Sequence, residues 1–127
     1  MNYLLLAAAA AQVFNLNCTG ESSGFQERKS FSLVYRVDLS RKKWCVGECR
    51  RLDDFVEIGP THLTFEKKER ITPWAVTYEI KTVDRETGKY VSEHIVDQNR
   101  GYQARKEWSG QCERLPFTCF PSFKTKF

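Results

Sequence analysis

Hydrophobic and polar residues alternate along most of this chain with a period of two, and no sustained helical period interrupts them. Between residues 30 and 39 the odd positions are apolar and most of the even positions are polar. In the segment 74–83, the large apolar residues Trp74, Val76, Tyr78 and Ile80 alternate with Ala75, Thr77, Glu79 and Lys81. The same alternation continues through 13–18 and 102–112. Such segments predict β-strands with one face in a core and the other face in solvent.

Turn-forming residues separate these segments. Gly59-Pro60 and the sequence 84–88, which ends in Gly88, are typical of hairpin turns, while 40–42 and 98–101 predict short connections. Residues 20–29 are polar and rich in Gly, Ser and Glu, so we expect a longer loop there.

The pattern predicts about eight short strands joined locally, with no helix to cover the sheet. A sheet of this kind can bury its apolar face by closing into a small antiparallel up-and-down β-barrel, which also removes exposed edges. A two-sheet β-sandwich is the alternative. The predicted barrel is one domain over residues 12–115, and we expect 116–127 to form an irregular tail packed on it.

Residues 1–11 are free of charged side chains and end in a run of alanines, which is typical of a signal peptide with its cleavage site before Gln12. The apolar run is too short to span a bilayer, so we expect no stable membrane insertion. The alternatives are a buried N-terminal helix and a lipid anchor at Cys18. The signal peptide predicts a periplasmic or secreted protein.

Five cysteines in an exported chain indicate a disulfide framework with one thiol left over. Cys45 and Cys49 flank a short loop that contains Gly47, so a bridge between them is favoured. Cys18 and Cys112 share the apolar parity of the first and last strands, and their bridge would close the barrel. Pairing of Cys18 with Cys119 remains the alternative. The spacing of the Cys and His residues does not match a zinc site, so no metal is expected.

The formal charge of +4 arises from basic and acidic residues that are interspersed, which argues against a nucleic-acid interface. No nucleophile motif, phosphate-binding loop or cofactor motif is present, so we expect neither catalysis nor a cofactor. His94 is a candidate base or ligand contact, although a histidine without catalytic duty is the favoured interpretation. His62 is the second histidine.

Aromatic residues are the remaining candidates for contact with a ligand or a protein partner. The tryptophans lie in predicted strands, where we expect them to fill the core, and the tail phenylalanines either cover the barrel end or contact a partner. The candidates are Trp44, Trp74, Trp108, Phe120 and Phe123.

The chain resembles a group of short exported proteins of alphaproteobacterial type that have no assigned activity. The resemblance rests on the sequence around Asn17–Gly20, on Tyr35–Leu39 with Lys43–Cys45, on Val83–Arg85 with Thr87-Gly88, and on Trp108–Cys112. Its size and strand pattern are also remotely similar to small periplasmic barrels of the calycin or lysozyme-inhibitor type. The resemblance implies an exported barrel and assigns no ligand.

From these patterns we expect a monomeric, non-enzymatic binding or inhibitor module for an unknown protein or small-molecule ligand. The alternatives are a structural or stress-related envelope protein without a small ligand, and a small hydrolase that uses His94 or a carboxylate pair.

Overall fold

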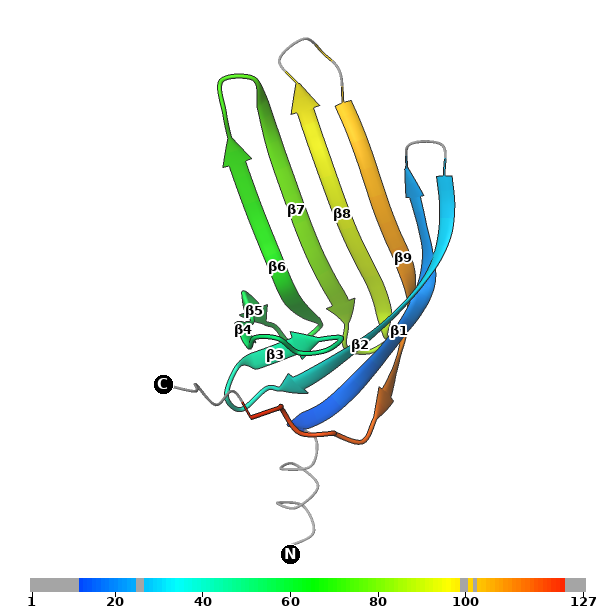
Figure 1. The fold of residues 1–127 in the computed structure, drawn as a ribbon, viewed down its shortest axis with the longest axis vertical. Coiled ribbons are helices and arrows are strands. Elements are labelled where there is room, and N and C mark those ends of the chain that lie inside the picture. The colour runs from blue at the N-terminus through cyan, green and yellow to red at the C-terminus, as the bar shows by residue number, and fades with distance from the viewer. Residues whose placement is uncertain (1–11, 25–26, 99–100, 102, 123–127) are drawn as a thin grey trace, which may run out of the picture.

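The computed structural model describes residues 12–24, 27–98, 101 and 103–122, and these form one antiparallel sheet of nine strands with no helix among them (Figure 1). The predicted all-β class is confirmed. The strands are β1 (Val13–Gly24), β2 (Glu27–Asp38), β3 (Lys43–Val46), β4 (Asp53–Asp54), β5 (Glu57–Ile58), β6 (His62–Ile71), β7 (Ala75–Asp84), β8 (Lys89–Gln98) and β9 (Gln103–Leu115).

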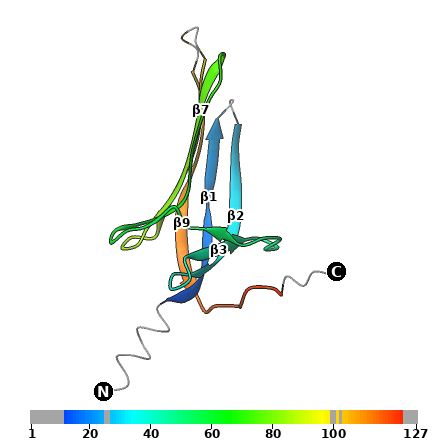
Figure 2. The same cartoon turned by 90° about the vertical axis from the view of Figure 1, so that its left-hand side faces the viewer.

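The strands that come first and last in the described chain, β1 and β9, are neighbours in the sheet. The strand order is β4-β3-β2-β1-β9-β8-β7-β6-β5, so every neighbouring pair except β1–β9 is also adjacent in sequence. The sheet curls around its inner face, and in the view of Figure 2 the β1–β2 hairpin faces the β6–β9 strands. This arrangement is consistent with the predicted small up-and-down barrel.

The segment 53–58 bridges the two ends of the curled sheet. Its first part, β4, pairs with β3, and its last part, β5, pairs with β6. Between them the Phe55 amide donates to the Lys42 carbonyl over 3.1 Å, and the Val56 amide donates to the Thr64 carbonyl over 2.9 Å. The curled sheet is therefore joined at this end, which is the lower end in Figure 1.

The sheet is open at the opposite end. The last contacts of β2 with β3 are the pairing of Tyr35 with Val46 and the hydrogen bond from the Gly47 amide to the Val34 carbonyl. The part of β2 before Val34 pairs only with β1 among the described strands. On the other side, β6 beyond Glu66 pairs only with β7. The nine strands, against about eight expected, include the two-residue β4 and β5, which make the closure.

The predicted loop at 20–29 is wrong, because most of this segment extends β1 and β2. Their pairing continues to Gly24 opposite Glu27, and β9 pairs with β1 on the other side as far as Ser23 opposite Glu107. Most side chains of these strand ends are exposed, so strand pairing holds them extended, and the hydroxyl of the buried Ser22 donates to the Lys29 carbonyl over 3.3 Å.

The core is a cluster of aromatic rings at the closed end. Tyr35 lies 4.7 Å from Phe65 and 5.8 Å from Trp44 between ring centroids, and Phe55 lies 5.0 Å from Phe65. The buried cluster also contains Phe14, Leu16, Cys18, Val37, Leu39, Leu63, Val83, Tyr90 and Cys112. The parity predicted for 13–18 and 30–39 is therefore correct: the apolar residues of both segments face inward.

Two glycines permit the close approach of β1 and β9. Gly20 and Gly110 face each other in register, and a Cβ on Gly110 would lie 2.1 Å from the Thr19 carbonyl oxygen. Phe31 and Tyr90 occupy the flanking positions of the same cross-strand row, and their ring centroids are 5.6 Å apart. Glycines opposite each other favour strong curvature, and the rings from the neighbouring strands cover the glycines.

Two disulfides fasten this sheet. Cys18 and Cys112 are opposite each other in register on the inner face of β1 and β9 and are bonded over a sequence separation of 94. Cys45 and Cys49 close a short loop after β3. These are the pairings that parity and loop length favour, and the alternative with Cys119 is not formed, since Cys119 is a free, exposed thiol.

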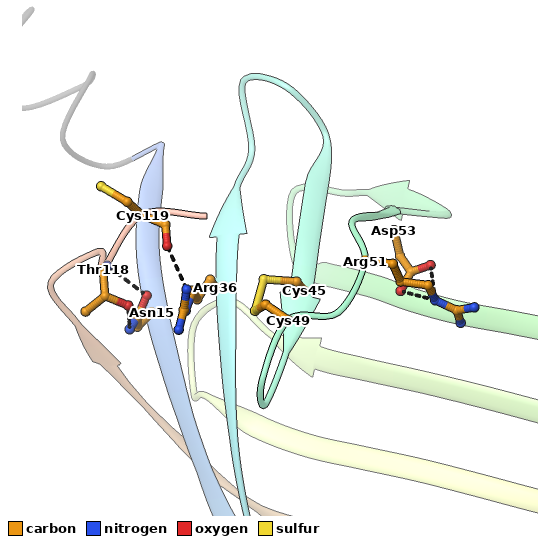
Figure 3. Close-up of a disulfide and its surroundings, with 8 residues drawn as sticks. All are labelled: Asn15, Arg36, Cys45, Cys49, Arg51, Asp53, Thr118 and Cys119. Carbon is orange, nitrogen blue, oxygen red and sulfur yellow. Dashed lines mark hydrogen bonds and ion pairs between the residues drawn. A yellow bond between two sulfur atoms is a disulfide. The ribbon is translucent and has the colours of Figure 1, made fainter. Parts of the chain in front are cut away.

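The segment after β9 contacts the outer face of β1 and β2 (Figure 3). The Asn15 amide donates to the Thr118 hydroxyl over 2.9 Å, and the Arg36 guanidinium donates to the Cys119 carbonyl over 2.8 Å. Phe117 and Phe120 pack edge to face with their centroids 5.2 Å apart, and both are half-buried. The tail prediction for Phe123 lies outside the described residues.

Candidate functional site

The inner face of the sheet changes from apolar to polar above the aromatic core. Following the register from the core residues Val83 and Tyr90 toward the open end, the next inward positions are Lys81 and Ser92, and then Glu79 and His94. Lys81 is opposite Glu66 on β6, and Ser92 is opposite Trp108 on β9. We call this surface the inner polar patch: Glu66, Glu79, Lys81, Ser92, His94, Lys106 and Trp108.

The charged side chains of the inner polar patch contact one another or the ring of Trp108. Lys81 Nζ lies 3.4 Å from Glu66 Oε2, and these side chains are only 26% and 22% exposed. His94 Nδ1 lies 2.9 Å from Glu79 Oε1. Lys106 Nζ lies 5.0 Å from the Trp108 ring centroid, which is within the range of a cation–π contact. The patch thus combines carboxylate acceptors, ammonium and imidazole donors, and one aromatic face.

The orientation expected for the apolar side of 74–83 is wrong for most of β7. Val76, Tyr78 and Ile80 lie on the outer face and are half-buried. Val83 of the same strand is buried in the core, so the odd-numbered residues of β7 face inward and the even-numbered ones face outward. The inward positions are occupied by Glu79 and Lys81. Their charge is kept at the half-buried inner surface by the ion pairs with His94 and Glu66.

A cavity of about 480 Å³ opens beside the patch between β3, the loop after it, and β6–β7. Trp44, Cys49, Arg51, Glu66 and Lys81 are among its lining residues. A smaller hollow of about 100 Å³ is lined by Glu66, Lys81, Glu79, His94 and Trp108 among others. The Glu66–Lys81 ion pair lines both, so the two spaces meet at this pair.

The Cys45–Cys49 disulfide holds the loop that lines the larger cavity. Cys49 has a positive φ of 53°, and the Cys49 amide donates to the Val46 carbonyl over 3.1 Å, so the loop turns tightly back on β3. Farther along it, Arg51 forms an ion pair of 3.2 Å with Asp53 (Figure 3). The disulfide therefore positions a guanidinium–carboxylate pair at the cavity wall.

Two tyrosine hydroxyls lie between the core and the patch. The oxygens of Tyr35 and Tyr90 are 3.0 Å apart and buried. Burial raises the pKa of Tyr35 far above its usual value, and the neighbouring Tyr90 and the charge of Glu66 raise the pKa further. Tyr35 therefore stays protonated at all physiological pH values and acts as a hydrogen-bonding core residue.

The other end of the barrel carries a second hollow of about 360 Å³. Phe14, Leu16, Leu63 and Val83 contribute apolar side chains to it, and the β7–β8 turn lies along its rim. Within that turn the amides of Thr87 and Glu86 donate to the Asp84 carboxylate over 2.9 and 2.8 Å. These hydrogen bonds, that of Thr87 first, lower the pKa of Asp84 below its usual 3.8.

The structure separates the candidate tryptophans. Trp44 is buried in the core, and its indole nitrogen donates to the Asp54 carbonyl over 3.2 Å. Trp108 lies in the inner polar patch and packs against the core. Trp74, which we expected in the core, is 80% exposed, because it lies in the turn between β6 and β7 and not in a strand.

The two histidines lie in different parts of the sheet and have different partners. His94 faces the inner polar patch with Glu79. His62 lies 3.7 Å from Asp84 at the closed end and is exposed. Within the described residues no group of three or more His, Cys, Asp or Glu side chains is placed to hold a metal ion.

Sequence reasoning missed Glu79 and Lys81 as members of a site, and it considered Glu66 only in a carboxylate pair with Glu69. Strand position could have identified them: Glu79 and Lys81 lie an even number of residues before Val83, which is buried, and Glu66 lies opposite Lys81.

The described part of the chain also has no helix long and apolar enough to cross a membrane. Comparison of the chain with protein families, with characterised proteins and with solved structures finds no significant match.

Proposed function

We propose that the protein is an exported, non-enzymatic ligand-binding module and that the inner polar patch is its binding surface. One observation carries this proposal: the Glu66–Lys81 and Glu79–His94 pairs occupy inward positions of a curled sheet. Half-buried ion pairs add little stability to a fold, and apolar residues at such positions would serve packing as well or better. Hydrogen bonding to a ligand would explain why charged residues occupy these inward positions.

The ligand class follows from the charges of the patch. Two glutamates balance two lysines, and His94 carries charge only when it is protonated. A surface with alternating donors and acceptors, no excess charge and one aromatic face suits a neutral, hydroxyl-rich molecule, such as a short saccharide. The cavity of about 480 Å³ is within the usual range for small-molecule sites.

The proposed cellular location is the periplasm or the cell exterior. The two disulfides support it, since such bonds persist in oxidising compartments. The proposed signal peptide, residues 1–11, lies outside the described residues. Intact-mass measurement of the protein recovered from an expressing cell should show that residues 1–11 are removed and that two disulfides and one free thiol are present. Recovery of a full-length chain with five thiols would contradict this location.

The binding proposal is tested by titrating the disulfide-bonded protein with trisaccharides of glucose and of N-acetylglucosamine. Backbone amide NMR shifts and the indole N–H resonance of Trp108 report on the patch. We expect shift changes clustered on β6–β9 at the inner polar patch, and Glu66→Gln or Glu79→Gln should weaken binding by about tenfold, the effect of one lost charge-assisted hydrogen bond.

The matched control is Glu69→Gln, which removes the same charge from an exposed position of β6. It should bind as the unchanged protein does. An absence of shift changes with either sugar at millimolar concentration, or equal weakening by Glu69→Gln, would reject the proposal. A shift pattern confined to the closed end would assign binding to the hollow beside Asp84 instead.

A further inference from the structure

The β6–β7 hairpin displays two large apolar side chains at its tip. Trp74 is 80% exposed and Ile71 is 74% exposed, the highest values among the large hydrophobic residues in the described ranges. The hairpin projects at the open end, away from the closed core (Figure 1). Two large apolar side chains exposed together at one hairpin tip form a candidate surface for an apolar partner.

The exposure of Trp74 is imposed by an ordered turn. The Thr72 amide donates to the Ala75 carbonyl over 2.9 Å. The Thr72 hydroxyl also bonds this carbonyl, over 3.0 Å, and it accepts from the Ala75 amide over 3.1 Å. Pro73 fixes the backbone angle between them. These bonds hold the backbone of the turn, so Trp74 is placed at the tip, beyond the last paired residues Ile71 and Val76.

Basic residues immediately precede the apolar tip. Lys67, Lys68 and Arg70 are all exposed on β6, with Glu69 as the single acidic residue among them. At about 3.3 Å per residue along a strand, all three basic residues lie within about 15 Å of Ile71. Because alternate residues point to opposite faces, the cations surround the tip on both sides of the hairpin.

We propose that this hairpin tip is a docking site for the surface of an anionic lipid bilayer. Trp74 and Ile71 enter the headgroup region, where a tryptophan ring is favoured because its body is apolar and its N–H is polar. Lys67, Lys68 and Arg70 contact the anionic headgroups above them. The contact is peripheral and reversible, and it leaves the inner polar patch open, so it does not depend on the proposed ligand.

The charges favour a membrane over a second copy of the chain as the occupant. A neighbouring copy would bring its own Lys67, Lys68 and Arg70 against these cations if the same tips met. An anionic bilayer supplies opposite charge over the whole area, with an apolar layer beneath that takes up the two side chains.

The test is co-sedimentation of the disulfide-bonded protein with vesicles of phosphatidylcholine containing about one-third phosphatidylglycerol, compared with vesicles of phosphatidylcholine alone. We expect binding to the anionic vesicles that weakens as salt is added. Trp74→Ala should weaken it by about tenfold, and the triple change K67Q/K68Q/R70Q by about a hundredfold.

Tryptophan fluorescence gives a second measurement on the same samples. Trp44 is buried and Trp108 half-buried, whereas Trp74 is exposed, so a blue shift on adding anionic vesicles should come from Trp74. The shift should disappear in Trp74→Phe, which keeps an apolar ring at the tip and should retain binding.

Two matched controls lie at the closed end. Val56→Ala removes an apolar side chain that is 54% exposed, and R41Q/K42Q/K89Q removes the same number of positive charges as the triple change at the tip. Both controls should bind vesicles almost as the unchanged protein does. Circular dichroism and thermal unfolding establish that each variant folds.

Three outcomes would overturn the proposal. The first is no binding to anionic vesicles, and the second is equal loss in the closed-end controls. The third is a concentration-dependent dimer, measured by light scattering without lipid, that Trp74→Ala abolishes, which would assign the tip to a second copy of the chain.

Discussion

The hydroxyl oxygens of Tyr35 and Tyr90 lie 3.0 Å apart inside the sheet, joining β2 to β8 across the barrel interior. Both residues are almost fully buried, with exposed fractions of 0% and 1%. Removal of one hydroxyl would strand the other without its partner. Tyr90→Phe should therefore lower the free energy of unfolding by about 1–3 kcal/mol, and Tyr35→Phe by a similar amount.

The double variant Y35F/Y90F is the informative one. With both hydroxyls gone, no polar atom of the pair remains to be satisfied, so its loss should be well below the sum of the single losses. Urea unfolding of all four proteins measures this coupling. Strictly additive losses would mean that each hydroxyl has another partner.

The long-range disulfide should stabilise the fold far more than the short one. In the chain-entropy model, the separation of 94 residues between Cys18 and Cys112 corresponds to about 4–5 kcal/mol. The separation of 4 residues between Cys45 and Cys49 corresponds to about 2 kcal/mol. Urea unfolding of C18A/C112A and C45A/C49A should give losses in that order.

The short disulfide should matter more for the cavity than for stability. C45A/C49A releases the loop that carries Arg51 beside the cavity, so saccharide binding should weaken while most of the fold's stability remains. This expectation depends on the proposed function. Equal losses of stability from the two double changes would contradict the entropic argument itself.

Gly110 should tolerate no side chain. An ideal Cβ at this position would meet the Thr19 carbonyl oxygen at 2.1 Å, and a backbone atom in a paired strand cannot move aside cheaply. Gly110→Ala should lower the free energy of unfolding by more than about 2 kcal/mol. Ser109→Ala, at the neighbouring exposed position of β9, is the control and should change stability little. Similar stability of both variants would show that β1 and β9 are not packed this closely.

Stability should fall in acid partly through Asp84. The amides of Thr87 and Glu86 lower the pKa of this carboxyl in the folded protein below its usual 3.8, whereas the unfolded chain keeps the usual value. The stabilisation is therefore present above about pH 4 and is lost as the pH falls through the lowered pKa. Asp84→Asn removes this titration.

The measurement for Asp84 is the urea midpoint of both proteins between neutral and strongly acidic pH. Over the acidic part of this range the urea midpoint of the unchanged protein should fall more than that of Asp84→Asn. The difference between the two midpoints should therefore become smaller as the pH falls. Parallel curves would show that the turn carboxylate does not distinguish the folded from the unfolded chain.

The sequence predicts the strands better than it predicts their inner side. At 13–18 and 30–39 the apolar residues face inward, because burial of Leu16, Tyr35 and Val37 decides the parity. At 74–83 the same reasoning fails: Val76, Tyr78 and Ile80 lie outside while Glu79 and Lys81 lie inside. Periodicity reveals two faces but does not say which one is inward. That choice is set here by Val83 through its register with Tyr90 and Leu63.

The candidate site depends on this same choice. His94 and Trp108 could be proposed from their residue types, but Glu66 and Lys81 are ordinary charged residues until the register places them side by side. The exposed position of Trp74 follows likewise from its place in a turn, which composition and parity alone did not reveal.

The pairing of β1 with β9 also constrains the order in which the molecule can form. A chain that emerges from its N-terminus first presents β1 and β2 early, and their hairpin can assemble at once. The other edge of β1 must wait until 103–115 has arrived, nearly the whole length of the domain later. Until then Cys18 has no partner in register, so its bond to Cys112 can form in the native register only after β9 has been made.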